Sequence, residues 1–319
     1  MRLKGLHHIS MITGNARANF DFYTKVLGLR LVKKTVNQDS PYTYHLYYAD
    51  EIGNPGTTLT FFEIPEAIRG SKGYNSIARV GLRVPNDEAL AYWEERLTMF
   101  HVKHSGVYEQ FDRNVLDFED VDGLSVQLIS DRRNEGVAGG TPWEGSPVPS
   151  EFAIIGLGPV LFSTLKKEKT DRVLSKVLGF DRMGAFEDDE KLVTVFQVGE
   201  GGNGAEVQLE GNFKDAHAVE GIGSVHHVAF RVEDDAQLRE WVEYIQDLGY
   251  PNSGFVDRHY FHSLYFREEN GILIELATDG PGFKTDFEKE RGTYVELPPA
   301  LEDRRAEIEA HLTELDTDI

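Results

Sequence analysis

The sequence predicts an α+β protein of four βαβββ modules that pair into two domains. Three observations support this fold class. A short strand followed by a helix occurs four times, each helix is followed by apolar alternating runs typical of strands, and a stretch rich in Gly, Pro and Ser separates the second repeat from the third. At 319 residues the chain is too long for one ordinary core, which a duplicated unit explains.

The first module begins with a strand-like run over residues 5–11 and continues into a helical stretch over residues 15–27. Gly28 ends this helix, since glycine readily takes the left-handed backbone conformation that closes a helix. Two alternating apolar runs then predict strands over residues 42–48 and 57–64.

The second module repeats this order. A strand over residues 77–84 precedes an Asn86-Asp87 helix cap. The helix that follows has apolar side chains at helical spacing, namely Leu90, Trp93, Leu97 and Phe100. Its further strands are predicted over residues 115–118 and 124–129.

The third and fourth modules follow the same plan. The third has a strand over residues 155–162 and a helix over about 170–178, and the fourth has a strand over residues 225–232 and an amphipathic helix over residues 234–248. A glycine closes each of these helices as well. The remaining predicted strands cover residues 192–198, 205–209, 263–267 and 272–277.

Residues 134–150 are rich in Gly, Pro and Ser and are predicted to be a linker. They divide the chain into an N-terminal domain of two modules, residues 1–133, and a C-terminal domain of two modules, residues 151–280. Residues 281–319 make a charged C-terminal extension. In this extension a narrow apolar stripe predicts a docked helix, through Leu301, Ile308 and Leu312.

The composition excludes several classes of protein. Asp and Glu number 54 against 33 Lys and Arg, and the net charge of −21 would repel nucleic acid or an anionic membrane. Cysteine is absent, so thiolate metal sites and thiol nucleophiles are ruled out. No apolar run approaches the ~18 residues that span a bilayer. We expect a soluble cytoplasmic protein with no nucleic-acid or membrane partner, and a homo-oligomer is compatible with this composition.

Strand alternation directs one histidine of each His-His pair away from the helix. In the fourth module His227 shares a face with Ala229, while the intervening apolar side chains form the floor beneath the helix. The first module places His8 on the equivalent face. His7 and His226 then face the helix side or the strand edge, and each stays an alternative ligand to its neighbour.

A carboxylate stands at the matching position of the last predicted strand. Glu275 lies among apolar neighbours, and a carboxylate in a core strand needs a partner. The equivalent positions of the other three modules hold Thr60, Gln127 and Gln208. Only the first and fourth modules therefore supply metal ligands, and we predict that these two lie side by side while the second and third pair without a metal. His8, His227 and Glu275 form a two-His-one-carboxylate set, suited to non-haem Fe(II) and equally able to take Mn(II), or Zn(II) with water.

This plan, with His in the first strand and Glu in the last, resembles the vicinal oxygen chelate superfamily, which includes glyoxalase I, extradiol ring-cleaving dioxygenases and bleomycin-resistance proteins. The resemblance covers nearly the whole chain. The segments at residues 5–10, 23–37, 225–229 and 265–268 are most similar to bacterial ring-cleaving dioxygenases associated with hydroquinone and catechol stress. The resemblance implies concave mixed β-sheets, Fe(II) as the metal, and a small aromatic diol with O₂ as the reactants.

The fourth module also resembles the sequence signature of extradiol enzymes, and the match begins at Tyr265. Leu264-Tyr265 is followed by an acidic residue, a glycine and then Glu275. The resemblance implies that Tyr265 hydrogen-bonds a substrate oxygen and that His259 or His262 transfers a proton. The chain departs from the signature at Glu269, which stands where the signature has proline.

We therefore expect a non-haem Fe(II)-dependent ring-cleaving dioxygenase of the extradiol type, acting on a catechol- or hydroquinone-type compound. One alternative is a glyoxalase-like lyase or isomerase, which would prefer a second carboxylate where this chain has Thr60. Another is a metal-free aromatic-binding resistance protein, which would not need two histidines and a glutamate in register. Other histidines are expected at solvent-exposed or rim positions, namely His45, His101, His104 and His217.

Overall fold

A computed structural model describes residues 1–283 and 292–317. The first module contains β1 (Leu6–Thr13), α1 (Ala16–Asp21), β2 (Arg30–Asn37), β3 (Ser40–Ala49) and β4 (Thr58–Glu63). The second contains β5 (Ser76–Val84), α2 (Asp87–Met99), β6 (His104–Gln110), β7 (Arg113–Glu119) and β8 (Ser125–Ser130). The third contains β9 (Gly156–Thr164), α3 (Lys167–Arg172), β10 (Asp181–Asp188), β11 (Lys191–Gln197) and β12 (Glu206–Gly211). The fourth contains β13 (Val225–Val232), α4 (Asp235–Asp247), β14 (Val256–Asp257), β15 (Phe261–Arg267) and β16 (Leu273–Pro281), and α5 (Arg305–His311) follows in the extension.

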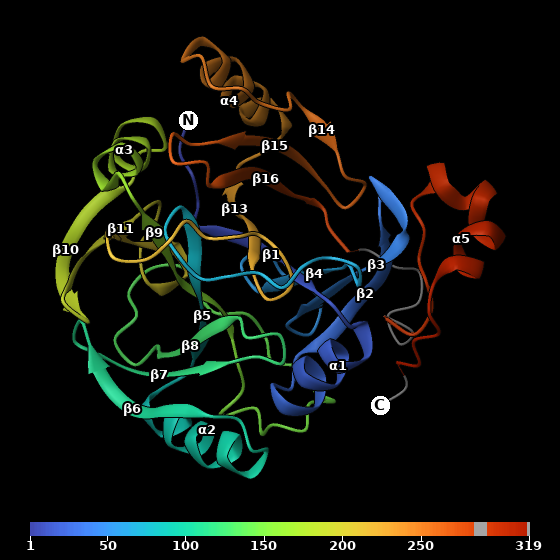
Figure 1. Ribbon diagram of the computed structural model, residues 1–319, viewed down its shortest axis with the longest axis horizontal. Coiled ribbons are helices and arrows are strands. Elements are labelled where there is room, and N and C mark those ends of the chain that lie inside the picture. The colour runs from blue at the N-terminus through green and yellow to red at the C-terminus, as the bar shows by residue number, and fades with distance from the viewer. Residues whose placement is uncertain (284–291, 318–319) are drawn as a thin grey trace.

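The strands form two mixed eight-stranded sheets, each curled into a half-barrel (Figure 1). One sheet has the order β14-β15-β16-β13-β1-β4-β3-β2, and the other has the order β10-β11-β12-β9-β5-β8-β7-β6. The first and fourth modules therefore share one sheet, and the second and third share the other. This arrangement confirms the predicted fold class and the predicted pairing of modules.

Three helices begin at a side-chain cap. Asn15, Asn86 and Asp234 each accept a backbone N–H from three residues ahead, at 2.9 Å. α3 begins before its predicted start at about residue 170, and Lys166 at its N-terminus makes no side-chain cap hydrogen bond. The sequence carries no start signal there, which explains the difference.

The sequence patterns locate two of the three strands that follow each helix. The strand that they leave out is the edge strand of each module, β2, β6, β10 or β14. An edge strand pairs on one side only, and β10 is largely exposed on both faces. β10 therefore has no need of alternating apolar residues, and its sequence gives a weak signal.

The two faces of the first sheet pack against different groups. Val228 and Phe230 belong to the large core beneath the helices. Ala229 lies on the other face in a small cluster that includes Phe261. The observed packing matches the alternation predicted for β13, which directs His227 away from the helix.

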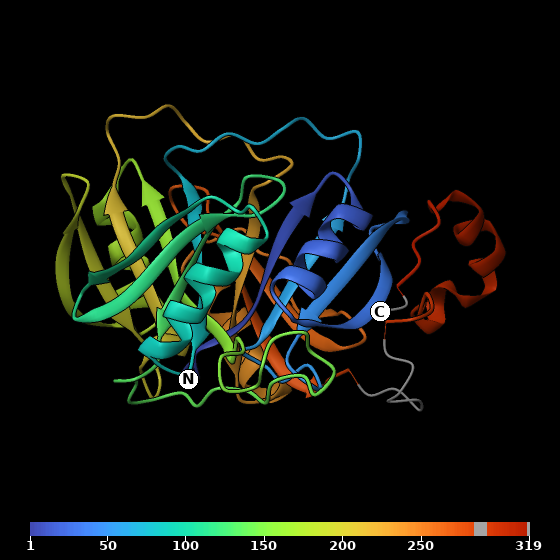
Figure 2. The same cartoon turned by 90° about the horizontal axis from the view of Figure 1, so that it is seen from below.

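Two connecting segments, residues 64–75 and 212–224, cross from one sheet to the other. They run beside each other and form single β-bridges, at Arg69 with Ile222, Ser71 with Val219 and Tyr74 with His217. Figure 2 shows both segments arching over the same side of the molecule. The two crossings therefore tie the sheets together along one edge.

The C-terminal extension docks on the outer strands of the first module. Ile308 of α5 is fully buried against Val36 and Leu297. Tyr44 OH also donates to the carbonyl of Thr313 at 2.8 Å. A docked helix is what the apolar stripe predicts. None of the helices in the described residues is both long enough and apolar enough to cross a membrane.

Residues 134–150 lie between the second and third modules along the chain. They pack on the first module, where Ser146 Oγ donates to the carbonyl of Gly28 at 2.8 Å. Each sheet combines modules from before and after this stretch, so the stretch separates the halves of the chain but not the two sheets. The division into domains 1–133 and 151–280 stays a prediction.

Candidate metal centre

The three predicted metal ligands converge at one point of the first sheet. His8 Nε2 lies 3.0 Å and His227 Nε2 lies 2.8 Å from Glu275 Oε2, and the two nitrogens are 3.3 Å apart. All three side chains are buried. Within residues 1–283 and 292–317, this is the only group of three His, Asp or Glu side chains whose ligand atoms lie close enough to share a metal ion.

Three adjacent strands, β1, β13 and β16, supply one ligand each. β1 pairs antiparallel with β13, which places His8 opposite Ala229. β13 runs parallel to β16, with Ala229 opposite Glu275. Strand pairing therefore brings together two histidines that are 219 positions apart in the chain.

A β-bulge accompanies each ligand histidine. The register of β1 with β13 shifts at His7 and again at His226, so neither residue has a partner directly opposite. His7 Nδ1 lies 2.8 Å from His8 Nδ1, and His226 Nδ1 lies 2.7 Å from His227 Nδ1. Each ligand histidine thus uses Nδ1 for its neighbour and keeps Nε2 for the centre. His7 and His226 thus contact Nδ1 of His8 and His227, on the side of each ring away from Glu275.

Glu275 fits a metal better than it fits any protein partner. Ser263 Oγ donates to Glu275 Oε1 at 2.5 Å. Oε2 is buried and accepts no hydrogen bond, although both ligand nitrogens lie within 3.0 Å of it. A buried carboxylate oxygen between two imidazole nitrogens needs either a proton on one of them or a cation, and a divalent metal ion would bind all three atoms. Ligand atoms ~2.1 Å from one ion and at right angles to each other lie about 3.0 Å apart, which matches these distances.

The protonation states favour a metal as well. Burial is the largest effect on Glu275 and by itself raises its pKa, but the imidazoles of His8 and His227 together hold the pKa well below its usual range. Burial lowers the pKa of His227 to about 4, against the opposing effect of Glu275. At neutral pH the centre offers a carboxylate and a neutral imidazole, the forms that bind a metal.

The centre opens on a hollow of about 490 Å³. Apolar and aromatic side chains make much of its wall, including Ile12, Phe62, Phe261 and Leu273. Polar side chains also line it, among them Asn37, Gln38, Asp39 and Arg258. The hollow therefore offers room and an aromatic surface beside His8 and His227.

Tyr265 lies in this hollow beside His227, with ring centroids 5.6 Å apart. Arg258 Nε donates to Tyr265 OH at 3.3 Å, and Arg258 Nη1 donates to the carboxylate of Asp39 at 3.2 Å. Burial is the largest cause of a raised pKa at Tyr265. The residue is therefore a neutral phenol at neutral pH, able to donate a hydrogen bond next to the centre.

His259 and His262 lie elsewhere. Along β15 the side chains alternate, and His262 is on the opposite face from Tyr265, with Nδ1 2.6 Å from Asp235 Oδ1 at the start of α4. Together with His259 it lines a separate surface hollow. The structure does not bring either histidine to the hollow that holds the ligands.

His45 lines the hollow, although its sequence position gives no reason to expect more than a solvent-exposed or rim residue. Its Nε2 lies 2.9 Å from Thr60 Oγ1, and its Nδ1 lies 3.0 Å from Tyr47 OH. The alternation of the predicted strand over residues 42–48 was the available signal, because it places His45 and Tyr47 on one face. Ser263, two positions from Tyr265, could have been found in the same way.

The equivalent positions of the second sheet carry a polar network. Arg79 Nη2 donates to Gln208 Oε1 at 3.0 Å, and Gln127 Nε2 donates to Asp117 Oδ1 at 2.9 Å. In the part of the chain that the structure describes, no group of metal ligands forms there. Arg79 and Gln208 bond to each other instead, and Gln127 bonds to Asp117.

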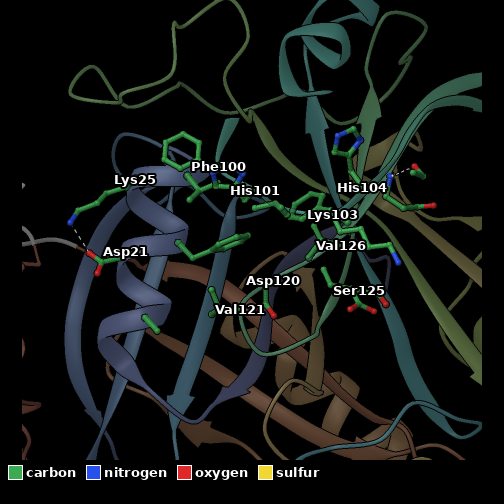
Figure 3. A pocket seen from close by; sticks show the side chains of 18 of the residues that line it. Asp21, Lys25, Phe100, His101, Lys103, His104, Asp120, Val121, Ser125 and Val126 are labelled. Carbon is green, nitrogen blue, oxygen red and sulfur yellow. Dashed lines mark hydrogen bonds and ion pairs between the residues drawn. The ribbon is translucent and has the colours of Figure 1, made fainter. Parts of the chain in front are cut away.

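A larger hollow of about 1090 Å³ lies away from the ligands (Figure 3). Phe100, His101 and His104 line it on the side of α2, and Asp21 and Lys25, an ion pair at 2.8 Å, line it on the side of α1. None of the three converging ligands borders this hollow. The smaller hollow is therefore the candidate site, because it alone of these two adjoins the metal ligands.

The fold and the centre define a class of protein. The family model described as the Glyoxalase/Bleomycin resistance protein/Dioxygenase superfamily matches residues 5–128 and 169–276. The chain belongs to this superfamily, the vicinal oxygen chelate proteins, which confirms the resemblance seen in the sequence.

Within this superfamily the chain belongs with the dioxygenases. "Putative ring-cleaving dioxygenase MhqA" of Bacillus subtilis (strain 168) is 48% identical over 314 residues, which cover 98% of this chain and 99% of that protein. The chlorohydroquinone/hydroquinone 1,2-dioxygenase of Sphingobium indicum is 32% identical over 315 residues, which cover 96% of this chain and 95% of that protein.

Solved structures agree on the fold. A Bacillus subtilis crystal structure described as a "putative dioxygenase" has a TM-score of 0.90 at 36% identity and covers 99% of both chains. Glyoxalase I from Zea mays has a TM-score of 0.62 at 14% identity and covers 86% of this chain and 92% of that one. At that identity the maize structure bears on the fold alone.

Proposed function

We propose that this chain is a non-haem Fe(II)-dependent ring-cleaving dioxygenase of the extradiol type, with His8, His227 and Glu275 as ligands and a catechol- or hydroquinone-type compound as substrate. The observation that carries the proposal is the set of three ligand atoms 2.8–3.3 Å apart beside an aromatic-lined hollow. The name of the Sphingobium relative, a hydroquinone dioxygenase, supports the substrate class.

Bound Fe(II), held by His8, His227 and Glu275, would supply Lewis acidity toward a diol oxygen and a redox-active centre through which the diol, the reductant, passes electrons to O₂. The side chains do the rest. Tyr265 donates a hydrogen bond to a substrate oxygen, and Arg258 holds the Tyr265 hydroxyl in place from the rim. The apolar wall, including Phe62 and Ile12, orients the ring and excludes water.

The donor set also accepts Mn(II), or Zn(II) with water. Zn(II) has no redox chemistry, so it suits a lyase rather than an oxygenase. We propose Fe(II) because the relatives are named as dioxygenases. Metal analysis of protein purified without air is the direct measurement.

Two other functions are less well supported. A glyoxalase-like lyase would prefer a carboxylate at Thr60, whose hydroxyl is instead hydrogen-bonded to Ser10 and His45 at 2.7 and 2.9 Å. A metal-free aromatic-binding protein would leave Glu275 Oε2 buried without a partner. Neither alternative accounts for the whole centre.

The proposal assigns no proton transfer to His259 or His262, since both lie outside the hollow. A small aromatic diol and O₂ are the proposed reactants. Action in the cytoplasm and assembly into a homo-oligomer stay predictions.

The test uses protein loaded with Fe(II) under anaerobic conditions and a panel of substituted catechols and hydroquinones. Oxygen uptake and the absorbance of a ring-opened product should appear together with at least one member of the panel. Turnover of a glutathione adduct without O₂, and no oxygen uptake with any diol, would replace this proposal by the lyase.

A further inference from the structure

Four side chains beside the metal ligands form a continuous row of hydrogen bonds. Ser10 Oγ lies 2.7 Å from Thr60 Oγ1, which lies 2.9 Å from His45 Nε2, and His45 Nδ1 lies 3.0 Å from Tyr47 OH. Ser10 follows His8 by two positions on the same face of β1. Both ends of the Ser10–Thr60–His45 segment line the hollow.

The sheet register sets this row. Ser10 lies opposite Thr60 in the pairing of β1 with β4, and Thr60 lies opposite Tyr47 in the pairing of β3 with β4. The row therefore runs straight across three paired strands, starting next to a metal ligand. The His45 ring lies between the rings of Tyr47 and Phe62, with centroids 4.2 and 4.1 Å away. This packing holds the imidazole in place.

Every member of the row can both donate and accept. A hydroxyl has one proton and two lone pairs, and a neutral imidazole has one donor and one acceptor nitrogen. The hydrogen bonds between Ser10, Thr60 and His45 can therefore reverse direction. An ionised carboxylate at position 60 could only accept hydrogen bonds and would interrupt the row. The threonine hydroxyl both donates and accepts, so it can transfer a proton.

His45 is neutral at rest. Burial is the main cause of its pKa being well below the usual value; His8, His227 and Arg258 lower it further, and Glu275 opposes them. The imidazole is therefore neutral at neutral pH and has one ring nitrogen that can accept a proton.

Building on the proposed function, we propose that His45 takes up the proton of a substrate hydroxyl through Ser10 and Thr60 and later returns it to an oxygen of the product. In the forward step the substrate O–H bond breaks and a new O–H bond forms at Ser10. Ser10 passes its own proton to Thr60, and Thr60 passes its proton to His45 Nε2, so that one N–H bond forms. The reverse sequence restores the neutral row, and no oxidant or reductant is consumed.

The experiment compares iron-loaded wild type with His45→Gln, Thr60→Val and the double variant. The probe is 4-nitrocatechol, a coloured catechol whose absorbance reports its ionisation, mixed without air in a stopped-flow instrument. Glutamine can bond to Thr60 but cannot carry a proton, and valine matches threonine in shape but breaks the row. Each single variant should slow ionisation of the probe about 100-fold, the scale of a lost general base.

Further variants distinguish loss of the proton relay, the path from Ser10 through Thr60 to His45, from loss of the folded structure. Iron content and circular dichroism should match wild type in His45→Gln, and the double variant should be no slower than either single one. Thr60→Ser should recover most of the rate lost in Thr60→Val, together with the solvent deuterium effect of wild type. The exposed His217→Gln is the matched control. If Thr60→Val does not fold, the ionisation rates of His45→Gln and Thr60→Ser test the relay.

Ionisation of the probe at the wild-type rate in His45→Gln or Thr60→Val would overturn the relay. The relay would also be overturned if His262→Gln slowed ionisation and His45→Gln did not. Oxygen uptake is then measured separately with the wild type. Fast ionisation without oxygen uptake on any diol contradicts the proposed function but supports the relay. Ring cleavage that is fast in His45→Gln contradicts the relay alone.

Discussion

Glu275 is fully buried, and its two oxygens have different surroundings. Oε1 accepts the Ser263 hydroxyl, while Oε2 has the two ligand nitrogens within 3.0 Å and no hydrogen bond. A charge in such a place is retained only where a counter-charge compensates the loss of water. At the scale of single residues, the strongest indication of a metal centre is therefore Glu275 Oε2, a buried carboxylate oxygen without a hydrogen-bond partner.

Glu275→Gln should abolish metal retention while leaving the fold intact. The amide has nearly the same shape but no negative charge to offset the charge of the ion. Metal content after gel filtration and circular dichroism measure the two parts of this prediction. The exposed Glu233→Gln is the control and should keep its metal. Iron content in Glu275→Gln equal to wild type would contradict the ligand assignment.

Ser263→Ala should weaken metal binding without abolishing it. The hydroxyl orients Glu275 from outside the ligand set, and such outer contacts are worth roughly 10–100-fold in metal affinity. Competition with a chelator of known affinity measures the change. An affinity equal to wild type would show that packing alone orients the carboxylate.

Tyr265→Phe should lower kcat about 10–100-fold with little change in iron content. The lost hydrogen bond to a charged substrate oxygen is worth roughly 1.5–3 kcal/mol. Steady-state oxygen uptake gives the rate, and metal analysis gives the control. An oxygen-uptake rate near that of wild type would contradict the assigned role of this hydroxyl beside the substrate.

At the scale of elements, packing between segments sets the chemistry of single groups. The π-helical turn Phe22–Val26 carries Tyr23, whose hydroxyl donates to Asp120 Oδ2 at 3.0 Å in the loop after β7. Asp120 Oδ1 accepts the backbone N–H groups of Asp122 and Leu124, both at 2.9 Å. This contact joins the first module to the second, and burial raises the pKa of Asp120 to about 6.

The raised pKa of Asp120 predicts a definite pH dependence. The unfolded carboxyl has a pKa of about 3.9, so between pH ~4 and ~6 the folded state binds more protons than the unfolded state. The contribution of Asp120 to stability therefore falls as pH rises through this window, by about 3 kcal/mol at most. Asp120→Asn should not lose stability as pH rises through this window, because an amide does not ionise. The amide oxygen can keep the Oδ1 contacts, and the amide nitrogen can donate to the Tyr23 hydroxyl.

Urea unfolding of wild type and Asp120→Asn at several pH values measures the effect. The variant should gain stability relative to wild type as pH rises from 4 to 6.5, and the gain should level off above that. Tyr23→Phe is a useful companion, since it removes the hydroxyl that partly offsets the burial. A difference between wild type and Asp120→Asn that does not change with pH would contradict the raised pKa.

At the scale of the whole molecule, the candidate metal centre lies where the first and the fourth modules meet in one sheet. His8 comes from the first module and His227 from the fourth, and one sheet holds both. Because an unfolded chain scatters these three side chains, we expect metal binding to be coupled to folding. The second sheet has Arg79 and two amides at the matching positions and needs no ion.

A bound metal should therefore stabilise the protein, by an amount that rises with the logarithm of the free metal concentration above its dissociation constant. Mn(II), which resists oxidation in air, is a convenient probe, and 100 times its dissociation constant should add about 2.7 kcal/mol to the free energy of unfolding. Thermal unfolding at increasing Mn(II) measures this as a rising Tm, which a chelator should reverse. Glu275→Gln should show no rise. An equal rise in that variant would place the metal elsewhere.

The amino-acid sequence by itself determined the module plan and most helices, and it predicted that His8, His227 and Glu275 come together. These follow from local rules: a repeat keeps equivalent positions equivalent, a helix needs a cap and an apolar stripe, and a strand alternates its faces. His8, His227 and Glu275 stand out because they alone, at the repeated positions, carry side chains that are common metal ligands.

Tertiary structure alone decided the surroundings of that trio. The bulges at His7 and His226 arise where two distant strands pair, so each outer histidine turns to its neighbour instead of following simple alternation. His262 pairs with α4 on the far face of β15, while His45 joins Thr60 because β3 and β4 are neighbours. Strand pairing and loop packing depend on contacts between residues far apart in the chain, and no local pattern records them.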